Sequence, residues 1–213
     1  MSDTRSEHEK MLAGDVYRSP DDEIIARAMA ARTRLDAYNA TPQTDMDRRT
    51  AILREALVGF GPGLIRSPVT WEFGNILIGN GCFFNYDCIF LDSARITIGD
   101  HVAVGPRVVF STAGHPLEYD ERAAWNDAGR IAIGAMGYAR PIVVGDHVWI
   151  GASVTVLPGV TIGARSTIGA GSIVNRSIPP DVVAAGNPCR VIRTLRSAER
   201  ADAPSSPAIP EQP

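Results

Sequence analysis

His115 is the histidine of this chain whose sequence context best suits acid–base chemistry. It lies in Gly114-His115-Pro116, where glycine and proline constrain the backbone on either side of the imidazole. An imidazole has an ordinary pKa of about 6.5, so near neutral pH it can take a proton from a weak nucleophile such as an alcohol. A histidine on an arbitrary loop is more often a plain surface residue. The place of His115 at the root of a segment that leaves the repeat pattern favours a general base.

A metal site is the other chemistry that histidines and cysteines can support. His101 and His147 occupy equivalent positions in two Gly-Asp-His-Val segments, which is typical of turn residues in a repeat. Cys82 and Cys88 also share one repeat position and are better explained as small wall residues than as ligands. No two histidines have the short spacing of a zinc site, so we expect no metal. A phosphate-binding P-loop, a dinucleotide fingerprint and a Gly-x-Ser-x-Gly nucleophile are also missing from the sequence.

The composition excludes several classes of partner. The formal net charge of −3 gives no general attraction to nucleic acid or to an anionic membrane. No apolar run approaches the roughly 18 residues that span a bilayer, and the polar N-terminus has no signal-peptide core. Three cysteines are too few for a disulfide framework. We therefore expect a cytoplasmic protein that binds neither nucleic acid nor membranes.

The middle of the chain repeats with a period of six residues. Fifteen of the 20 glycines lie between Gly74 and Gly171. Aliphatic residues recur six apart without a slip at Val144, Ile150, Val156, Ile162, Ile168 and Val174. An earlier run with one slip of two residues contains Ile78, Phe84, Phe90, Ile98, Val104 and Phe110. This period predicts one short strand and one tight turn per repeat, with three repeats closing a triangle, and residues 74–194 would give about five coils of a parallel β-helix.

Residues 1–60 are predicted to form a helical leader. Ser19 would cap the first helix, Thr44-Asp45 would start the second, and Gly59 would end it. Each helix has one apolar stripe, made of Ile24, Ala28, Ala31, Leu35 and Tyr38 in the first and Ile52, Leu53, Ala56 and Leu57 in the second. Such a helical hairpin must pack against another part of the chain.

Residues 61–195 are expected to form the β-helix domain, interrupted by a segment at residues 111–141 that breaks the six-residue phase. Long insertions in a compact repeat domain are usually functional or disordered. This one carries Tyr119, Trp125 and Tyr138, so we expect it to pack against a neighbour. Residues 196–213 contain four prolines and almost no large apolar side chains, which predicts a disordered tail.

Several of these segments together resemble the maltose and galactoside O-acetyltransferases, which are hexapeptide-repeat acyltransferases. The resemblance covers roughly residues 10–195. It is carried by the Ile-Gly-Asp repeats, Gly114-His115-Pro116, Val148-Trp149-Ile150-Gly151, the leader segments Lys10–Tyr17 and Tyr38–Thr41, and the closing segment Ile178–Arg193. The resemblance implies a mainly β fold, with a left-handed parallel β-helix, an N-terminal helical hairpin and an extended loop. It also implies a homotrimer with active sites at subunit interfaces.

The same resemblance implies acetyl transfer from acetyl-CoA, as co-substrate and without a metal, to a hydroxyl of a small sugar or glycoside. His115 corresponds to the general base of the family. Positions that contact the acceptor correspond to Asn85, Asp92 and Glu72. Positions that bind the donor correspond to Trp149 in the pantetheine channel, the small residues Ala152 and Ala170, and the basic residues Arg176, Arg190 and Arg193 near the nucleotide phosphates. Without the resemblance, a structural role for Asn85 at a coil corner is as good an explanation as sugar binding. For the arginines, a charged cap on the repeat domain is then nearly as good an explanation as phosphate binding.

Three departures from the family pattern concern the acceptor. Ser19 stands where some members carry an acceptor-binding acid. The chain is one residue shorter just after Gly74, close to Glu72. The loop that follows His115 is longer than in typical members by the segment Ile131–Tyr138. We expect this longer loop to reshape the acceptor pocket and to admit a larger or more apolar alcohol.

Two other functions stay open from the residues alone. An enzyme of the same fold can acetylate an antibiotic, a lipo-oligosaccharide or another alcohol. A non-catalytic scaffold or a zinc protein like the γ-class carbonic anhydrases would have similar repeats, although the latter need three histidines on the metal. An acceptor screen with acetyl-CoA and a metal analysis would distinguish these possibilities.

Overall fold

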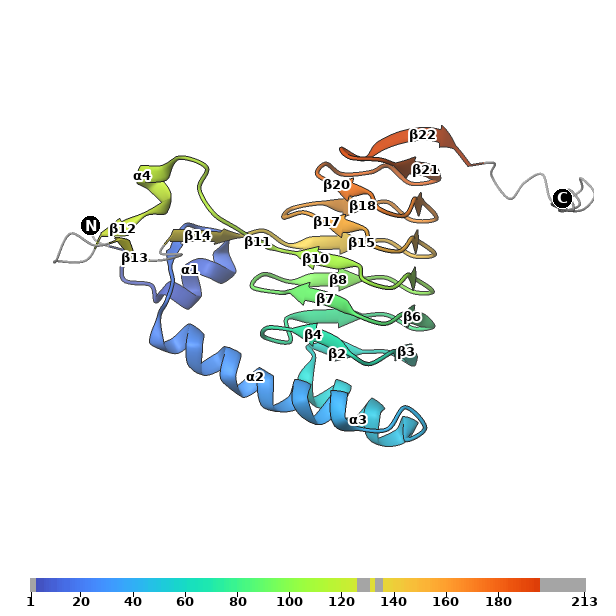
Figure 1. Cartoon of the computed structure of the whole chain (residues 1–213), viewed down its shortest axis with the longest axis horizontal. Coiled ribbons are helices and arrows are strands. Elements are labelled where there is room, and N and C mark those ends of the chain that lie inside the picture. The colour runs from blue at the N-terminus through green and yellow to red at the C-terminus, as the bar shows by residue number, and fades with distance from the viewer. Residues whose placement is uncertain (1–2, 126–130, 133–135, 196–213) are drawn as a thin grey trace, which may run out of the picture.

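A triangular β-solenoid of about six turns forms the body of the protein (Figure 1). The structure is a computed structural model that describes residues 3–125, 131–132 and 136–195. Sheet I contains β2 (Gly59–Phe60), β5 (Ile76–Ile78), β8 (Ile96–Ile98), β15 (Ile142–Val144) and β18 (Thr161–Ile162). Sheet II contains β3 (Gly63–Ile65), β6 (Cys82–Phe84), β9 (Ala103–Val104), β16 (Trp149–Ile150), β19 (Thr167–Ile168), β21 (Val182–Ala185) and the antiparallel β22 (Arg190–Thr194). Sheet III contains β4 (Val69–Trp71), β7 (Cys88–Leu91), β10 (Val109–Ser111), β17 (Thr155–Val156) and β20 (Ile173–Val174).

The chain passes from sheet I to II to III in every coil, so the prism has three corners, which we call I/II, II/III and III/I. The solenoid begins at Gly59, one coil before the first coil expected from the glycine-rich segment. The predicted six-residue series points inward as expected, and its members are at most 2 % exposed. Burial of these apolar side chains, together with the parallel hydrogen-bond ladders between coils, stabilises the prism.

The corners explain the repeated histidines and the buried cysteines. His101 and His147 have φ values of 57° and 58° at corner I/II, and their rings stack with centroids 5.2 Å apart. They are thus turn residues of neighbouring coils, as predicted. Cys82 and Cys88 are buried, unpaired residues of the prism wall. Among the residues that the structure describes, no cluster of three or more His, Cys, Asp or Glu side chains is arranged to hold a metal ion.

The leader contains α1 (Glu7–Ala13), β1 (Tyr17–Arg18), α2 (Asp22–Ala40) and α3 (Met46–Ala56), and α2 and α3 lie at the β2 end of the solenoid (Figure 1). The predicted stripes bury Ile24, Ala31, Leu35, Tyr38, Ile52, Leu53 and Leu57. Two predicted helix caps were wrong. Asp21 caps α2 in place of Ser19, because its carboxylate accepts hydrogen bonds from the N–H groups of Glu23 and Ile24. The C-cap of α3 is Leu57, and Gly59 already belongs to β2.

An excursion leaves the prism after β10 and returns at β15. It contains β11 (Ala113–Gly114), α4 (Tyr119–Arg122), β12 (Ala124–Trp125), β13 (Ile131–Ala132) and β14 (Met136–Ala139). Strand β14 pairs with β11 on one side and with β1 of the leader on the other, so the excursion lies beside α1 (Figure 1). Residues 133–135 of the predicted insertion and the tail at residues 196–213 lie outside the described residues. No helix in the described part of the chain is long and apolar enough to cross a membrane.

Candidate functional site

The small antiparallel sheet β1–β14–β11 holds His115 outside the prism at corner III/I. The Nδ1 atom of His115 lies 2.8 Å from the carbonyl oxygen of Met136 on β14. A carbonyl oxygen can only accept a hydrogen bond, so Nδ1 carries the proton and donates it. In the neutral ring this leaves the lone pair on Nε2, which is the atom free to accept a proton. The side chain of His115 is exposed in the single chain.

Gly114 is needed next to this histidine because Tyr138 packs across it from the neighbouring strand. A β-carbon at position 114 would lie 2.5 Å from Cζ and 2.6 Å from Oη of Tyr138. The guanidinium of Arg140 lies over the same ring, with its Cζ 5.0 Å from the ring centroid. Glycine therefore makes room for Tyr138, which is a more specific role than the constrained backbone path expected from the sequence.

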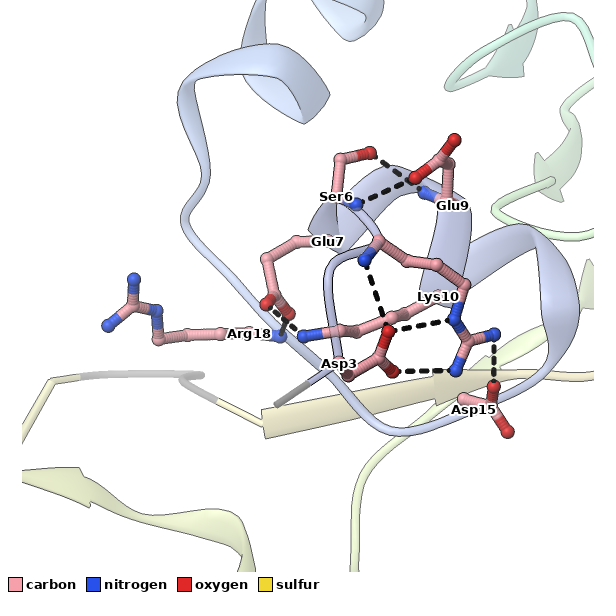
Figure 2. A network of polar contacts seen from close by, with 8 residues as sticks. Asp3, Ser6, Glu7, Glu9, Lys10, Asp15 and Arg18 are labelled. Carbon is pink, nitrogen blue, oxygen red and sulfur yellow. Dashed lines mark hydrogen bonds and ion pairs between the residues drawn. The ribbon is translucent and has the colours of Figure 1, made fainter. Parts of the chain in front are cut away.

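The N-terminal helix α1 fastens β1 to this sheet (Figure 2). The carboxylate of Glu7 accepts a hydrogen bond from the backbone N–H of Arg18 at 2.5 Å and another from Lys10 Nζ at 2.7 Å. Tyr17 is buried beside Arg18, and its ring approaches Gly137, where a β-carbon would lie 3.3 Å from the tyrosine Oη. The leader therefore supports, through β14, the carbonyl that orients the imidazole.

Further polar side chains lie at corner III/I in the two coils below His115. Glu72 follows β4 and Ser93 follows β7 on sheet III, as the excursion follows β10. Ser93 Oγ donates to Glu72 Oε2 at 3.4 Å, and the Ser93 hydroxyl lies near that of the buried Tyr17. Burial raises the pKa of the half-buried Glu72 carboxyl above its usual range, and the charge of Asp92 raises it further.

Asp92 differs from the acceptor contact that the sequence predicted. Its side chain is 0 % exposed. Its Oδ1 accepts from the backbone N–H groups of Glu72 at 2.7 Å and Phe73 at 3.1 Å, and its Oδ2 accepts from that of Asn75 at 2.6 Å. Both oxygens thus hold the preceding coil in place. Glu72 is partly exposed at this corner, whereas Ser93 is only 4 % exposed.

The outer face of sheet II carries Trp149, which is 59 % exposed. The strand register places Phe83, Ala103, Trp149, Thr167 and Val183 in one column on successive coils. Two coil steps of about 4.8 Å separate Trp149 from Phe83, which gives about 10 Å. Asn85 follows Phe84 at corner II/III, and the small residues Ala152 and Ala170 lie at the same corner in later coils.

Two of the three predicted basic residues lie on β22 at the end of sheet II, and one of them continues this column. Arg193 on β22 pairs with Val183, which puts it three strands beyond Trp149, or about 14 Å away. Arg190 is exposed on the same strand, and its Nη1 donates to Asn175 Oδ1 at 3.2 Å. Arg176 follows β20 and so lies at corner III/I, although it is the chain neighbour of Asn175.

The predicted site residues therefore fall into two groups in one chain. Corner III/I carries His115, Glu72, Asp92 and Arg176. Sheet II and corner II/III carry Asn85, Trp149, Ala152, Ala170, Arg190 and Arg193. The two groups occupy different corners of the prism, because the strands that position them belong to different sheets.

Sequence reasoning missed the groups that orient His115 and complete its corner. Met136 contributes a backbone carbonyl, for which a side-chain pattern gives no signal. Tyr17 was named only as the last residue of the leader segment Lys10–Tyr17, without a role in the site, and Ser93 was not named although it follows Asp92. Their contribution depends on the pairing of β1 with β14, which joins residues far apart in the chain.

Two segments of the chain match known protein families. Residues 10–61 match the maltose acetyltransferase hexapeptide capping motif. Residues 141–176 match the bacterial transferase hexapeptide family, described as six repeats. The chain is also 43 % identical over 190 residues to nodulation protein L of Rhizobium meliloti (strain 1021), an alignment that covers 88 % of this chain and 98 % of that protein.

Solved structures show the same fold over nearly the whole chain. A maltose O-acetyltransferase from Clostridium difficile 630 superposes with a TM-score of 0.83 at 37 % identity, covering 92 % of this chain and 100 % of that one. A galactoside acetyltransferase in complex with coenzyme A superposes with a TM-score of 0.81 at 34 % identity, covering 91 % and 92 % of the two chains.

Proposed function

The chain belongs to the maltose and galactoside O-acetyltransferase family of hexapeptide-repeat acyltransferases, and from this premise we propose that it acetylates a sugar or glycoside hydroxyl with His115 as general base. The observation that carries this proposal is the hydrogen bond from His115 Nδ1 to the Met136 carbonyl. It leaves Nε2 free for a substrate proton. The donor is acetyl-CoA, which agrees with the coenzyme A complex of the related galactoside enzyme.

The chemistry requires little more than a base and good positioning. The acceptor oxygen attacks the thioester carbonyl carbon while its proton passes to Nε2 of His115. The C–S bond then breaks, the proton moves to the leaving sulfur, and the products are an acetyl ester and free coenzyme A. A general base of this kind contributes roughly 10²- to 10⁴-fold, and holding two substrates together supplies much of the remaining acceleration.

The donor fits the outer face of sheet II. Its phosphates would lie against Arg193 and Arg190, because guanidinium groups bind phosphate oxygens well. Its pantetheine arm would run past Trp149 and the small corner residues Ala152 and Ala170. We include Arg176 among the phosphate contacts, since Asn175 links its segment to Arg190.

The acceptor would contact Asn85 and Glu72, with the buried Ser93 and Asp92 shaping the corner from beneath. His115 and Asn85 lie at different corners of one prism, so a second copy must complete the site. A partner whose sheet II faces corner III/I would place the partner subunit's Asn85 and the partner subunit's Trp149 beside His115. Repeating this contact around a threefold axis gives a homotrimer with three sites. We place the enzyme in the cytoplasm, where its three unpaired cysteines stay reduced.

A thiol-release assay with acetyl-CoA and a panel of simple sugars tests the proposal. We expect release that depends on the sugar, and a loss of about 10²- to 10⁴-fold in kcat for His115→Ala. Binding of coenzyme A, measured by calorimetry, should be unchanged in that variant. Sugar-independent release, or an active His115→Ala variant, would contradict the proposal. Analytical ultracentrifugation tests the trimer, and a stable monomer with full activity would rule out the shared site.

A further inference from the structure

Arg66, Phe83 and Tyr86 form a partly exposed cluster next to Asn85. Arg66 Nη1 donates a hydrogen bond to Tyr86 Oη at 2.9 Å. Its guanidinium carbon lies 5.1 Å from the centroid of the Tyr86 ring and 5.7 Å from that of Phe83. The three side chains therefore present one planar cation that lies over two aromatic rings.

The fold gives this cluster little structural work. Tyr86 is 40 % exposed, and the prism interior at this level is filled by Phe84 and Phe90. No carboxylate in the described part of the chain forms an ion pair with Arg66, whose guanidinium also donates a hydrogen bond to Gln43 Oε1 at 3.5 Å. The chain therefore leaves an aromatic surface and an unneutralised guanidinium exposed side by side, which favours a ligand with both apolar and hydroxyl surfaces.

The position of the cluster relates it to the acceptor. Tyr86 is the next residue after Asn85. Arg66 lies one coil earlier, a step of about 4.8 Å, and its backbone N–H donates to the carbonyl oxygen of Phe84. The Oδ1 of Asn85 accepts from the backbone N–H of Tyr86 at 2.9 Å. This bond turns the amide so that its NH₂ group remains to donate to a sugar hydroxyl. Phe83 is in the same column as Trp149, on the side away from the arginines of β22.

We propose that Arg66, Phe83 and Tyr86 form a second sugar-ring subsite beside Asn85, so that the preferred acceptor is an oligosaccharide or glycoside of at least two rings. The inference rests on the proposed sugar acetylation and specifies its substrate class. The ring that receives the acetyl group lies between His115 and the partner subunit's Asn85. The next ring places its C–H face on Tyr86 or Phe83, and its hydroxyls accept hydrogen bonds from Arg66.

Chain length of the acceptor tests the subsite directly. The probes are glucose, maltose and maltotriose, with cellobiose and cellotriose as the β-linked series, in a thiol-release assay at saturating acetyl-CoA. For the wild type we expect kcat/KM to rise at least about tenfold from glucose to the disaccharide of one series. Tyr86→Ala should remove that rise while changing kcat/KM for glucose less than about twofold, and Tyr86→Phe should keep most of it. Arg66→Ala should act on the longer acceptors in the same way.

Leu77→Ala is the matched control, because Leu77 is also 40 % exposed but lies on sheet I. It should leave the chain-length dependence intact, and the melting temperatures of all variants should agree within a few degrees. Equal kcat/KM for one, two and three rings in both series would overturn the subsite while leaving sugar acetylation standing. So would an equal loss for all acceptors in Tyr86→Ala. Thiol release with none of the sugars would overturn the proposed function. Calorimetric titration of maltotriose and cellotriose against wild type and Tyr86→Ala then tests the subsite separately, and equal binding overturns it.

Discussion

A clash designed at Gly114 tests whether the packing of the excursion positions the base. In Gly114→Ala the new β-carbon would lie 2.5 Å from Tyr138 Cζ, whereas ordinary contact begins at 3.4 Å, so something must move by about 0.9 Å. Strand β14 carries both Tyr138 and the Met136 carbonyl that holds His115. A displacement of the reacting group by about 1 Å typically costs about 10²-fold in rate, equivalent to about 2.7 kcal/mol of activation free energy.

We therefore expect kcat of Gly114→Ala to fall about 10²-fold in the thiol-release assay, with KM for acetyl-CoA unchanged, since Trp149 and Arg193 lie on another sheet. The double variant Gly114→Ala/Tyr138→Ala removes the ring that meets the new methyl group. The kcat of the double variant should be at least tenfold higher than that of Gly114→Ala. Two independent, additive losses would instead make the double variant no better than Gly114→Ala.

Gly137→Ala on the same strand is the control. Its β-carbon would lie 3.3 Å from Tyr17 Oη, so only a few tenths of an ångström of adjustment are needed and the activity should fall much less. If Gly114→Ala keeps its activity within about threefold, the Tyr138 ring yields without moving the strand, and the reasoning is refuted. A double variant no better than Gly114→Ala would refute it as well.

Three other substitutions have defined expected outcomes. Asp92→Asn should lower the free energy of unfolding by about 1–3 kcal/mol, because its amide nitrogen would leave a buried backbone N–H unpaired; an unchanged urea midpoint would exclude the corner role. Glu72 keeps its proton in the folded chain at pH values where the unfolded chain has lost it, since its folded pKa is raised. Wild-type stability should then fall as the pH rises from about 4.5 through the raised pKa. The fall should be smaller in Glu72→Gln when urea midpoints are compared at several pH values, because only Asp92, whose pKa burial also raises, then still contributes at this corner. Arg193→Ala should raise KM for acetyl-CoA about tenfold with little change in kcat, whereas Arg165→Ala, which removes an ion pair with Asp181 at another corner, should leave it unchanged.

The six-residue repeat, the two helical stripes and the family were determined by the sequence itself. These features depend on the spacing of residues that are close in the sequence. Every coil needs one inward-pointing residue per short strand, so the same spacing recurs along the chain. The wrong caps at Ser19 and Gly59 show the limit of such reasoning, since Asp21 and Leu57 compete for the same helix ends within one or two residues.

The surroundings of His115 were decided only by tertiary structure. Strand β1 pairs with β14 across more than a hundred residues, so no local pattern shows that Tyr17 and the Met136 carbonyl lie in one small sheet with His115. The same holds for Asp92, whose acidic side chain has the composition of a ligand contact but is folded beneath three backbone N–H groups. A sequence states which side chains are present, whereas the stacking of coils decides which of them face solvent, which face each other, and which corner they share.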